Sequence, residues 1–352
     1  MVVEVEDPPK PGRSSVGGGG CRCHHRQMES PRLTLVTGGA GYVGSLVVLE
    51  LLDRGHRVRV LDCLLHGGVP SLLGAWGRPG FEFVAGDVRD PKAREAALAD
   101  VDAVVHLAAI VGDPACAREP DAARSVNLDA TGSLLADSER LGIRRVVFAS
   151  TCSNYGRMAD GRLATEEFEL RPVSLYAETK VAAEQAVLAK ARNGLETCCL
   201  RFATVYGSSP RMRFDLTVNE FTRDLVLGDE LVVFGEQFWR PYIHVRDAAR
   251  AIAVALDAPR DKVDGEVFNV GATGENYRKL DIVELLQRRL PKARVRFVQK
   301  DEDPRDYRVA FDKIDATLGF RPEYTVSDGI NEMIALVSSG ILGNPHAEIF
   351  RN

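Results

Sequence analysis

The sequence predicts an α/β protein, in which a doubly wound parallel sheet is joined to a smaller C-terminal α/β lobe. Three observations predict this fold. Short apolar runs alternate with amphipathic stretches from Leu33 to Phe202, a glycine-rich turn follows the first apolar run, and the alternation becomes irregular after Tyr206. Apolar strands that alternate with helices are typical of a parallel sheet covered by helices on both faces.

The first half of the chain supplies the strands and crossover helices of this sheet. Buried strands are expected at residues 33–36, 57–62, 81–84, 101–107, 145–150 and 197–202. Helical periodicity lies between them, at 44–52, 92–99, 121–141 and 175–192. Parallel strands need such crossover connections, and these are usually helices.

The second half has a less regular pattern. Helices are expected at 216–227, 244–256, 280–290 and 326–337, and strands at 266–270 and 295–298. We therefore predict a first lobe of residues 31–205, to which 241–272 return. A second lobe then comprises 206–240 and 273–352.

Residues 1–30 are expected to be a disordered tail, because Pro8, Pro9, Pro11 and the run Gly17–Gly20 cannot build a packed element. Cys21-Arg-Cys23-His24-His25 has metal-ligand chemistry, but no second ligand pair with zinc-finger spacing follows, so no metal site is predicted. Met28 is a candidate for the native start. The intact mass of the native protein checks that hypothesis.

Composition narrows the classes of function. The chain has 352 residues, a formal net charge of −5 and 45% hydrophobic residues, with no basic stripe that would indicate a nucleic-acid partner. It has no apolar run long enough to cross a bilayer. Its seven cysteines have no regular spacing, which favours a reducing, cytoplasmic location over a disulfide framework.

The glycine-rich turn predicts a dinucleotide site of the Rossmann type. Gly38, Gly41 and Gly44 follow a strand and open a helix, so the backbone can approach a pyrophosphate at the helix N-terminus. Asp62 ends the next strand, where a carboxylate accepts bonds from ribose hydroxyls and repels a 2′-phosphate. NAD is therefore favoured over NADP. Asp87 ends the third strand and is placed either to contact adenine or to cap the following helix.

A second group of residues predicts proton transfer. Tyr176 and Lys180 are four residues apart and share one face of a helix. An ammonium group beside a phenol stabilises the phenolate, and so favours tyrosine as a general base. Thr151 lies at the carboxyl end of the fifth strand, the edge at which doubly wound sheets bind ligands, and can hold the reacting oxygen.

Together these features resemble the extended short-chain dehydrogenase/reductase family, within it the nucleotide-sugar epimerases and dehydratases, UDP-glucose/galactose 4-epimerase-like enzymes among them. The resemblance runs from about Leu33 to Leu336. It rests on Thr37-Gly-Gly-Ala-Gly-Tyr-Val-Gly44, His106-Leu-Ala-Ala109, Asn127, Ser150-Thr151 with Tyr155-Gly156, Tyr176–Lys180, Leu200-Arg201, Val205-Tyr-Gly207 and Arg240-Pro-Tyr-Ile-His-Val-Arg-Asp247.

The resemblance implies roles for individual residues. Thr151, Tyr176 and Lys180 are then catalytic. The predicted cofactor contacts, besides the glycines and aspartates above, are Tyr42, Val43, Val88, Leu107, Ala108, Ala109, Asn127, Ser150, Tyr176, Lys180 and Phe202. The predicted substrate contacts are Thr151, Thr204, Asn219, Arg240 and Arg305, with Asn219 and Arg240 on the diphosphate. His244 and Asp247 are expected to organise structure.

The residues after Thr151 bear on the reaction. The related dehydratases have Thr-Asp-Glu there, since elimination of water needs a further acid and base, whereas this chain has Cys152-Ser153-Asn154. The sequence therefore favours 4-epimerisation through a transient 4-ketone. Cys152 leaves a C3 or C5 epimerase open, although a small buried structural cysteine is favoured.

Other functions also stay open. They are a nucleotide-sugar C4 dehydrogenase or ketoreductase, a reductase of steroid or flavonoid ketones, and a dinucleotide sensor without catalysis. Asn219 and Arg240 disfavour an apolar substrate, and intact Tyr176, Lys180 and Thr151 disfavour a sensor. The family likeness further implies a homodimer.

Overall fold

The computed structural model describes residues 32–158, 161–192, 194–299 and 305–352. Pro31–Asn352 forms one compact unit. The predictions of a disordered tail at 1–30, of a start at Met28 and of no metal at Cys21–His25 lie outside the described residues. None of the described helices is both long enough and apolar enough to span a membrane.

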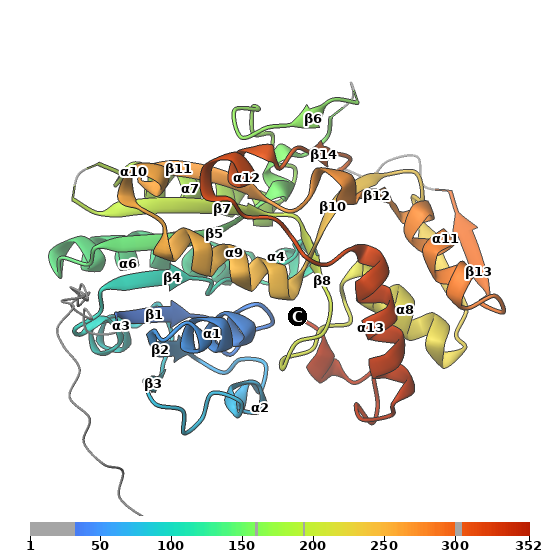
Figure 1. Ribbon diagram of the computed structural model, residues 1–352, viewed down its shortest axis with the longest axis horizontal. Coiled ribbons are helices and arrows are strands. Elements are labelled where there is room, and N and C mark those ends of the chain that lie inside the picture. Colours follow the sequence, from blue (N-terminus) through green and yellow to red (C-terminus); the bar gives the residue numbers. More distant parts are fainter. Residues whose placement is uncertain (1–31, 159–160, 193, 300–304) are drawn as a thin grey trace, which may run out of the picture. The chain divides into compact units, whose positions relative to one another are not determined.

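Seven of the described strands form one large parallel sheet (Figure 1). Its order is β11-β7-β5-β4-β1-β2-β3. The strands are β1 (Leu33–Thr37), β2 (Arg57–Asp62), β3 (Phe81–Ala85), β4 (Ala103–His106), β5 (Arg145–Thr151), β7 (Glu196–Phe202) and β11 (Glu266–Val270). The strand order reverses between β1 and β4, so the predicted doubly wound sheet is confirmed.

Helices cover both faces of this sheet, and together they form the first lobe. They are α1 (Gly44–Asp53), α2 (Val69–Leu72), α3 (Pro91–Leu98), α4 (Asp113–Arg118), α5 (Pro120–Arg124), α6 (Ala130–Arg140), α7 (Leu175–Leu188), α9 (Val245–Asp257), α10 (Arg260–Val263) and α12 (Asp312–Leu318). Neighbouring strand residues enter opposite cores: Val36 packs with α1 and α9, and Leu35 packs with α3, α6 and α7. This alternation explains why the strands are apolar throughout.

The helix predicted over 121–141 is interrupted. A π-helical turn, Ser125–Asp129, separates α5 from α6. π-Turns inside α-helices are frequent at functional sites, because the extra residue redirects a side chain. Here the turn contains Asn127, one of the predicted cofactor contacts.

The second lobe is built from short strands and three longer helices. Its strands are β8 (Thr204–Tyr206), β9 (Leu231–Phe234), β10 (Trp239–His244), β12 (Asn276–Arg278) and β13 (Val295–Val298), and its helices are α8 (Thr217–Leu227), α11 (Lys279–Arg289) and α13 (Val326–Ser338). β12, β10 and β8 form one small sheet, and β13 pairs with β9. β6 (Leu163–Ala164) pairs with β14 (Arg308–Val309) beside the two lobes. The predicted lobe boundaries stay a prediction.

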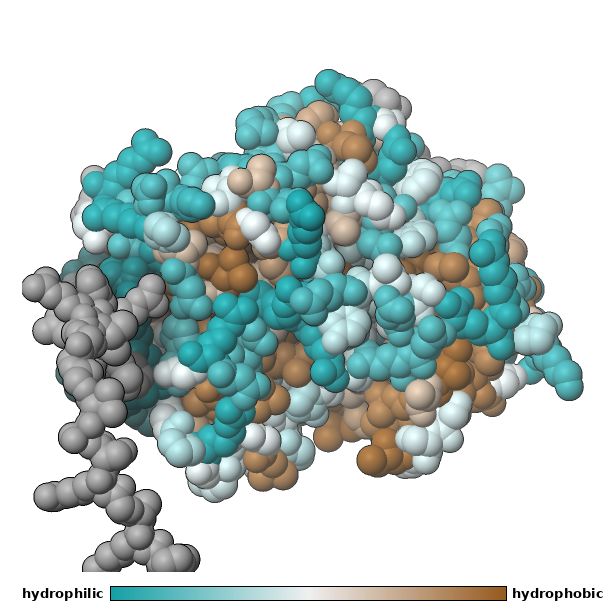
Figure 2. Space-filling model, in the orientation of Figure 1, coloured by the Kyte–Doolittle hydropathy of each residue, from teal (hydrophilic) through white to brown (hydrophobic). Residues whose placement is uncertain are grey.

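Figure 2 shows hydrophilic residues over most of one face of the protein, with an apolar group at its lower edge, where Figure 1 places the chain that follows α13. Ile341 lies in the segment that follows α13 and is 79% exposed.

Candidate active site

The glycine turn after β1 packs so closely against neighbouring backbone that two of its positions admit no side chain. Gly38 has φ +72°, and a Cβ there would lie 2.8 Å from the backbone nitrogen of Ala108. A Cβ on Gly44 would collide with the carbonyl oxygen of Gly38. No side chain in the described chain caps the N-terminus of α1, where the backbone nitrogens of Ser45 and Leu46 donate to the oxygens of Gly41 and Val43.

Asp62 ends β2 and lies beside this turn. Its carboxylate accepts bonds from the backbone nitrogens of Ala40, at 3.0 Å, and Leu64, at 2.8 Å. The carboxylate therefore joins the glycine turn to the loop after β2. Its position at the end of β2 is the one that the sequence predicts for a ribose contact.

Asp87 does not cap the helix that follows it. Asp90 is the N-cap of α3, and its side chain accepts from the backbone nitrogen of Lys92. Asp87 instead binds the guanidinium group of Arg89, at 2.6 Å from Nη2. That hydrogen bond lowers the pKa of Asp87. The capping alternative is therefore wrong, and the predicted adenine contact stays a prediction.

A buried histidine supports the loop that follows β4. His106 Nδ1 lies 2.7 Å from Thr37 Oγ1, and its Nε2 lies 2.9 Å from Thr131 Oγ1. Burial, together with the charge of Lys180, lowers the pKa of His106 to about 3, so the ring is neutral. Because the backbone nitrogen of Ala108 donates to Thr37 Oγ1, the loop at 107–109 is fixed to β1.

Asn127 connects the residue that follows this loop to the helix at 175–188. Its Oδ1 accepts from the nitrogen of Ile110 at 2.8 Å, and its Nδ2 donates to the oxygen of Ile110 at 3.0 Å and to Thr179 Oγ1 at 3.2 Å. Thr179 precedes Lys180 on α7. The π-helical turn thus places Asn127 between the cofactor loop and the predicted proton-transfer residues.

Helix α7 begins where the chemistry is expected. Ser174 caps it, accepting from the nitrogen of Ala177, so Tyr176 lies in the first turn and Lys180 one turn further on. Lys180 Nζ lies 4.0 Å from the ring centroid of Phe148 on β5. Thr151 ends the same strand, and its Oγ1 accepts from the nitrogen of Ser153 at 3.1 Å.

Burial acts on both ionisable groups of this pair. It raises the pKa of Tyr176, an effect that the charge of Arg213 opposes. It lowers the pKa of Lys180 to about 8, an effect that the charge of Glu184 opposes. Lys180 is therefore still mostly protonated at neutral pH, and can stabilise a phenolate on its helix face.

Behind Thr151 lies a buried polar network that the sequence did not predict. Ser150 Oγ donates to Glu184 at 2.5 Å, and Arg201 Nη2 donates to the same carboxylate at 2.5 Å. Cys152 is 1% exposed, and its thiol donates to the carbonyl oxygen of Arg201 at 3.1 Å. Burial raises the pKa of Cys152 well above 9, so the thiol stays protonated.

The predicted substrate arginines approach the same end of α7. Arg240 lies 5.5 Å from the ring centroid of Tyr307, whose hydroxyl is 3.3 Å from Ser153 Oγ. Arg305 pairs with Asp113 at 3.1 Å. Asp113 also accepts from Ser174, the cap of α7, at 2.7 Å.

Asn219 lies elsewhere, under the glycine turn. It is fully buried, and its amide donates to Tyr42 Oη at 3.2 Å and to the oxygen of Arg213 at 2.9 Å. Its Oδ1 accepts from the nitrogen of Gly207. A diphosphate contact would have to replace one of these bonds, and that role stays a prediction.

The other predicted contacts have less distinctive surroundings. Val88 is buried between β3 and α3, and Phe202 is buried at the end of β7. Thr204 begins β8, and Val43 and Leu107 pack against the core. Asp113, Ser174 and Tyr307 were missed as site residues. A serine immediately before a helical pattern is a capping signal, which would have found Ser174. The partners of Asp113 are too distant in sequence for such a signal.

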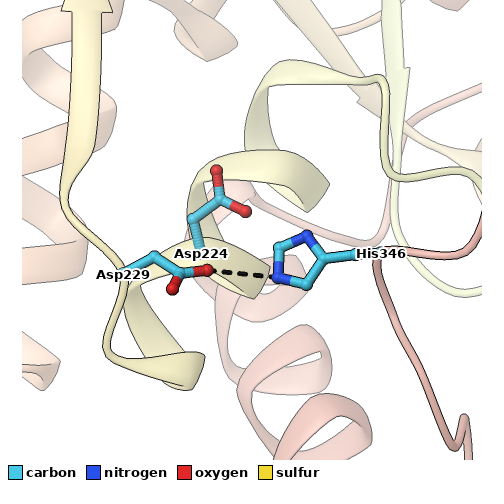
Figure 3. Close-up of side chains that lie close together, drawn as sticks. All are labelled: Asp224, Asp229 and His346. Carbon is cyan, nitrogen blue, oxygen red and sulfur yellow. Dashed lines mark ion pairs between the residues drawn. The ribbon is translucent and has the colours of Figure 1, made fainter.

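Metal-ligand side chains gather at one place on the second lobe. Asp224, Asp229 and His346 bring ligand atoms within 4.8 Å of one another (Figure 3). However, Arg223 already holds Asp224 at 2.6 Å, and His346 pairs with Asp229 at 3.1 Å. We assign no metal there.

Comparisons with known proteins agree with this geometry. The model of the NAD dependent epimerase/dehydratase family matches residues 34–271. A dTDP-glucose 4,6-dehydratase of Actinoplanes sp. is 34% identical over 317 residues, which cover 86% of this chain and 96% of that protein. A UDP-glucose 4-epimerase of Halalkalibacterium halodurans is 28% identical over 312 residues, or 82% of this chain and 90% of that protein.

Solved structures give the same result. The UDP-glucose 4-epimerase of Thermus thermophilus in complex with NAD superposes with a TM-score of 0.76 at 28% identity, covering 88% of this chain and 100% of that one. The chain belongs to the NAD dependent epimerase/dehydratase family. The predicted family and the predicted cofactor, NAD, are confirmed. The site also fits NAD, since a turn without side chains at Gly38, Gly41 and Gly44 opens α1, and the carboxylate of Asp62 ends β2 beside it.

Proposed function

We propose that this protein is an NAD-dependent nucleotide-sugar epimerase that inverts C4. The observation that carries the proposal is the segment after Thr151. Cys152 is buried, and the hydroxyl of Ser153 faces that of Tyr307. None of the three residues Cys152, Ser153 and Asn154 has a carboxylate. Elimination of water needs an additional acid and base at the sugar, whereas epimerisation at C4 needs a single proton-transfer residue.

Each residue of the site has a separate role in the proposed reaction. Bound NAD supplies an acceptor and donor of hydride. Thr151 holds the C4 oxygen at the end of β5, and Tyr176 takes its proton and later returns it. Lys180 provides the positive charge that favours the phenolate, and Ser174 fixes the start of their helix.

The proposed substrate is a sugar linked to a nucleoside diphosphate. Arg240 is 7% exposed and presents a permanent cation beside Tyr307, which suits a phosphate oxygen. Solved relatives include a UDP-glucose 4-epimerase with UDP-glucose and a UDP-glucuronic acid 4-epimerase with UDP-glucuronic acid and NAD. The homodimer and the cytoplasmic location remain predictions.

A panel of nucleotide sugars tests the proposal. The purified protein should convert one of them into its C4 epimer without net reduction of NAD. Tyr176→Phe should lower kcat roughly 10²–10⁴-fold, the range for loss of a positioned acid–base group. A 4-keto-6-deoxy product would identify a dehydratase instead, and accumulation of NADH would identify a dehydrogenase.

Dehydration is the second candidate, because two relatives named dTDP-glucose 4,6-dehydratase are 34% and 31% identical to this chain. Epimerisation at C3 or C5 through Cys152 has less support, since the thiol is buried and bonded to Arg201. Exchange of solvent deuterium into C3 or C5 would revive it. If C4 inverts, Cys152→Ala should retain the activity and show no such exchange.

A further inference from the structure

The end of the chain folds back onto the second lobe. Asn344–Ala347 form a turn, and the 3-10 helix Glu348–Phe350 follows it. Phe350 meets Phe214 with ring centroids 5.7 Å apart and packs against a cluster that contains Met212 and Val337. His346 pairs with Asp229 at the end of α8 (Figure 3).

Phe350 thus anchors residues 346–352 to the second lobe. The same residues reach the first lobe at two places. Ile349 lies beside Gly67, in the loop that follows β2: a Cβ added to that glycine would stand 4.0 Å from Ile349 Cδ1. Arg118, the last residue of α4, donates to the backbone oxygen of Asn352 at 3.2 Å. In Figure 1 the end of the chain is marked between α1 and α13.

The intervening contacts use the backbone of the segment. Phe214 donates its backbone N–H to the oxygen of Phe350 at 2.8 Å. Arg211 donates to the oxygen of Arg351, also at 2.8 Å. The loop between β8 and α8 is thereby tied to residues 350–351.

The two contacts on the first lobe flank the dinucleotide site. The loop that holds Gly67 starts at Asp62, the predicted ribose contact. Helix α4 starts at Asp113, which accepts from Ser174, the cap of the helix that carries Tyr176. Residues 346–352 therefore extend from the adenosine end of the site towards the proton-transfer end, at the strand edge where doubly wound sheets bind dinucleotides.

We propose that residues 346–352, the C-terminal strap, close over bound NAD and slow its release. Ile349 is 56% exposed, so its contact with the first lobe is small, whereas Phe350 is anchored in the second lobe. Opening would break the contacts of Ile349 and Asn352 and leave the anchor intact. Small local openings of this kind commonly control ligand release.

The dissociation rate of NAD tests the strap. The protein is saturated with NAD, passed through a desalting column, and the released nucleotide is followed over time by chromatography. Deletion of residues 345–352 should raise the dissociation rate about ten-fold or more, because changes of affinity fall mostly on dissociation. Ile349→Ala should raise it roughly three- to five-fold, as expected for about one buried methylene.

Ile341→Ala is the matched control, since Ile341 lies in the same terminal region but is 79% exposed. Its dissociation rate should stay at the wild-type value. If a folded deletion variant releases NAD at the wild-type rate, the strap proposal is wrong. If the deletion variant does not fold, equal rates for the two alanine variants would overturn it. The measurement needs no sugar substrate, so its result is independent of the proposed epimerase reaction.

Discussion

At the scale of single residues, the buried charge of Lys180 lowers the stability of the folded protein. Lys180 is 4% exposed, and burial lowers its pKa to about 8. An unfolded lysine titrates near 10.4, so below pH 8 the folded protein holds a buried charge at a cost. That cost disappears as the pH rises from 8 to 10.4, because the native residue loses its proton first.

Lys180→Met should therefore stabilise the protein while it disables the enzyme. A pKa lowered to about 8 corresponds to roughly 3 kcal/mol at most, and the ring of Phe148 offsets part of it, so a gain of about 1–3 kcal/mol is expected at pH 7. Urea unfolding should show the gain at pH 7 and little of it near pH 10.5. An equal gain at both pH values would contradict a buried charge as its source.

At the scale of elements, the glycine turn and α1 were predictable because their signals are local. The strand, the turn and the helix are adjacent in sequence, and the turn admits only glycine at Gly38 and Gly44. The π-helical turn at 125–129 was not predictable from periodicity, since it replaces part of a continuous helical pattern. Its cause is tertiary, because Asn127 bonds to Ile110 and to Thr179.

The helix glycines provide a matched pair of substitutions. Gly44→Ala places a methyl group against the Gly38 backbone, so it should weaken NAD binding and lower the free energy of unfolding by about 1–3 kcal/mol, as overpacking does. Gly132 lies inside α6, and within the described chain nothing would come within 4 Å of its Cβ. Gly132→Ala should raise the free energy of unfolding by about 0.5–1 kcal/mol. Calorimetry and NAD titration measure both effects.

At the scale of the whole molecule, the sequence predicted the sheet but not the contacts that join distant segments. Arg305 and Asp113 pair at 3.1 Å, and His244 meets Glu332 at 2.9 Å, although each pair is far apart in sequence. A sequence motif identifies residues that lie on one element or in one turn. Pairs of this kind depend on how distant elements pack against one another, which no local pattern encodes.

Glu332 on α13 gives the last prediction. It accepts from His244 on β10 and, at 2.6 Å, from Ser208 Oγ after β8. Burial alone would raise its pKa, but these hydrogen bonds lower it to about 2.

The bonds of Glu332 therefore stabilise the protein above pH 4.5, and the contribution is lost as the pH falls towards 2. Glu332→Gln should lower the free energy of unfolding by about 1–3 kcal/mol at pH 7 and by roughly half of that or less near pH 3, where part of the contribution is already lost. Glu323→Gln is the control, because that side chain is 64% exposed and pairs with Arg250 at the surface. Urea unfolding of both variants is measured at the two pH values. Equal losses for Glu332→Gln at pH 7 and pH 3 would show that the charge of Glu332 is not the source of its contribution.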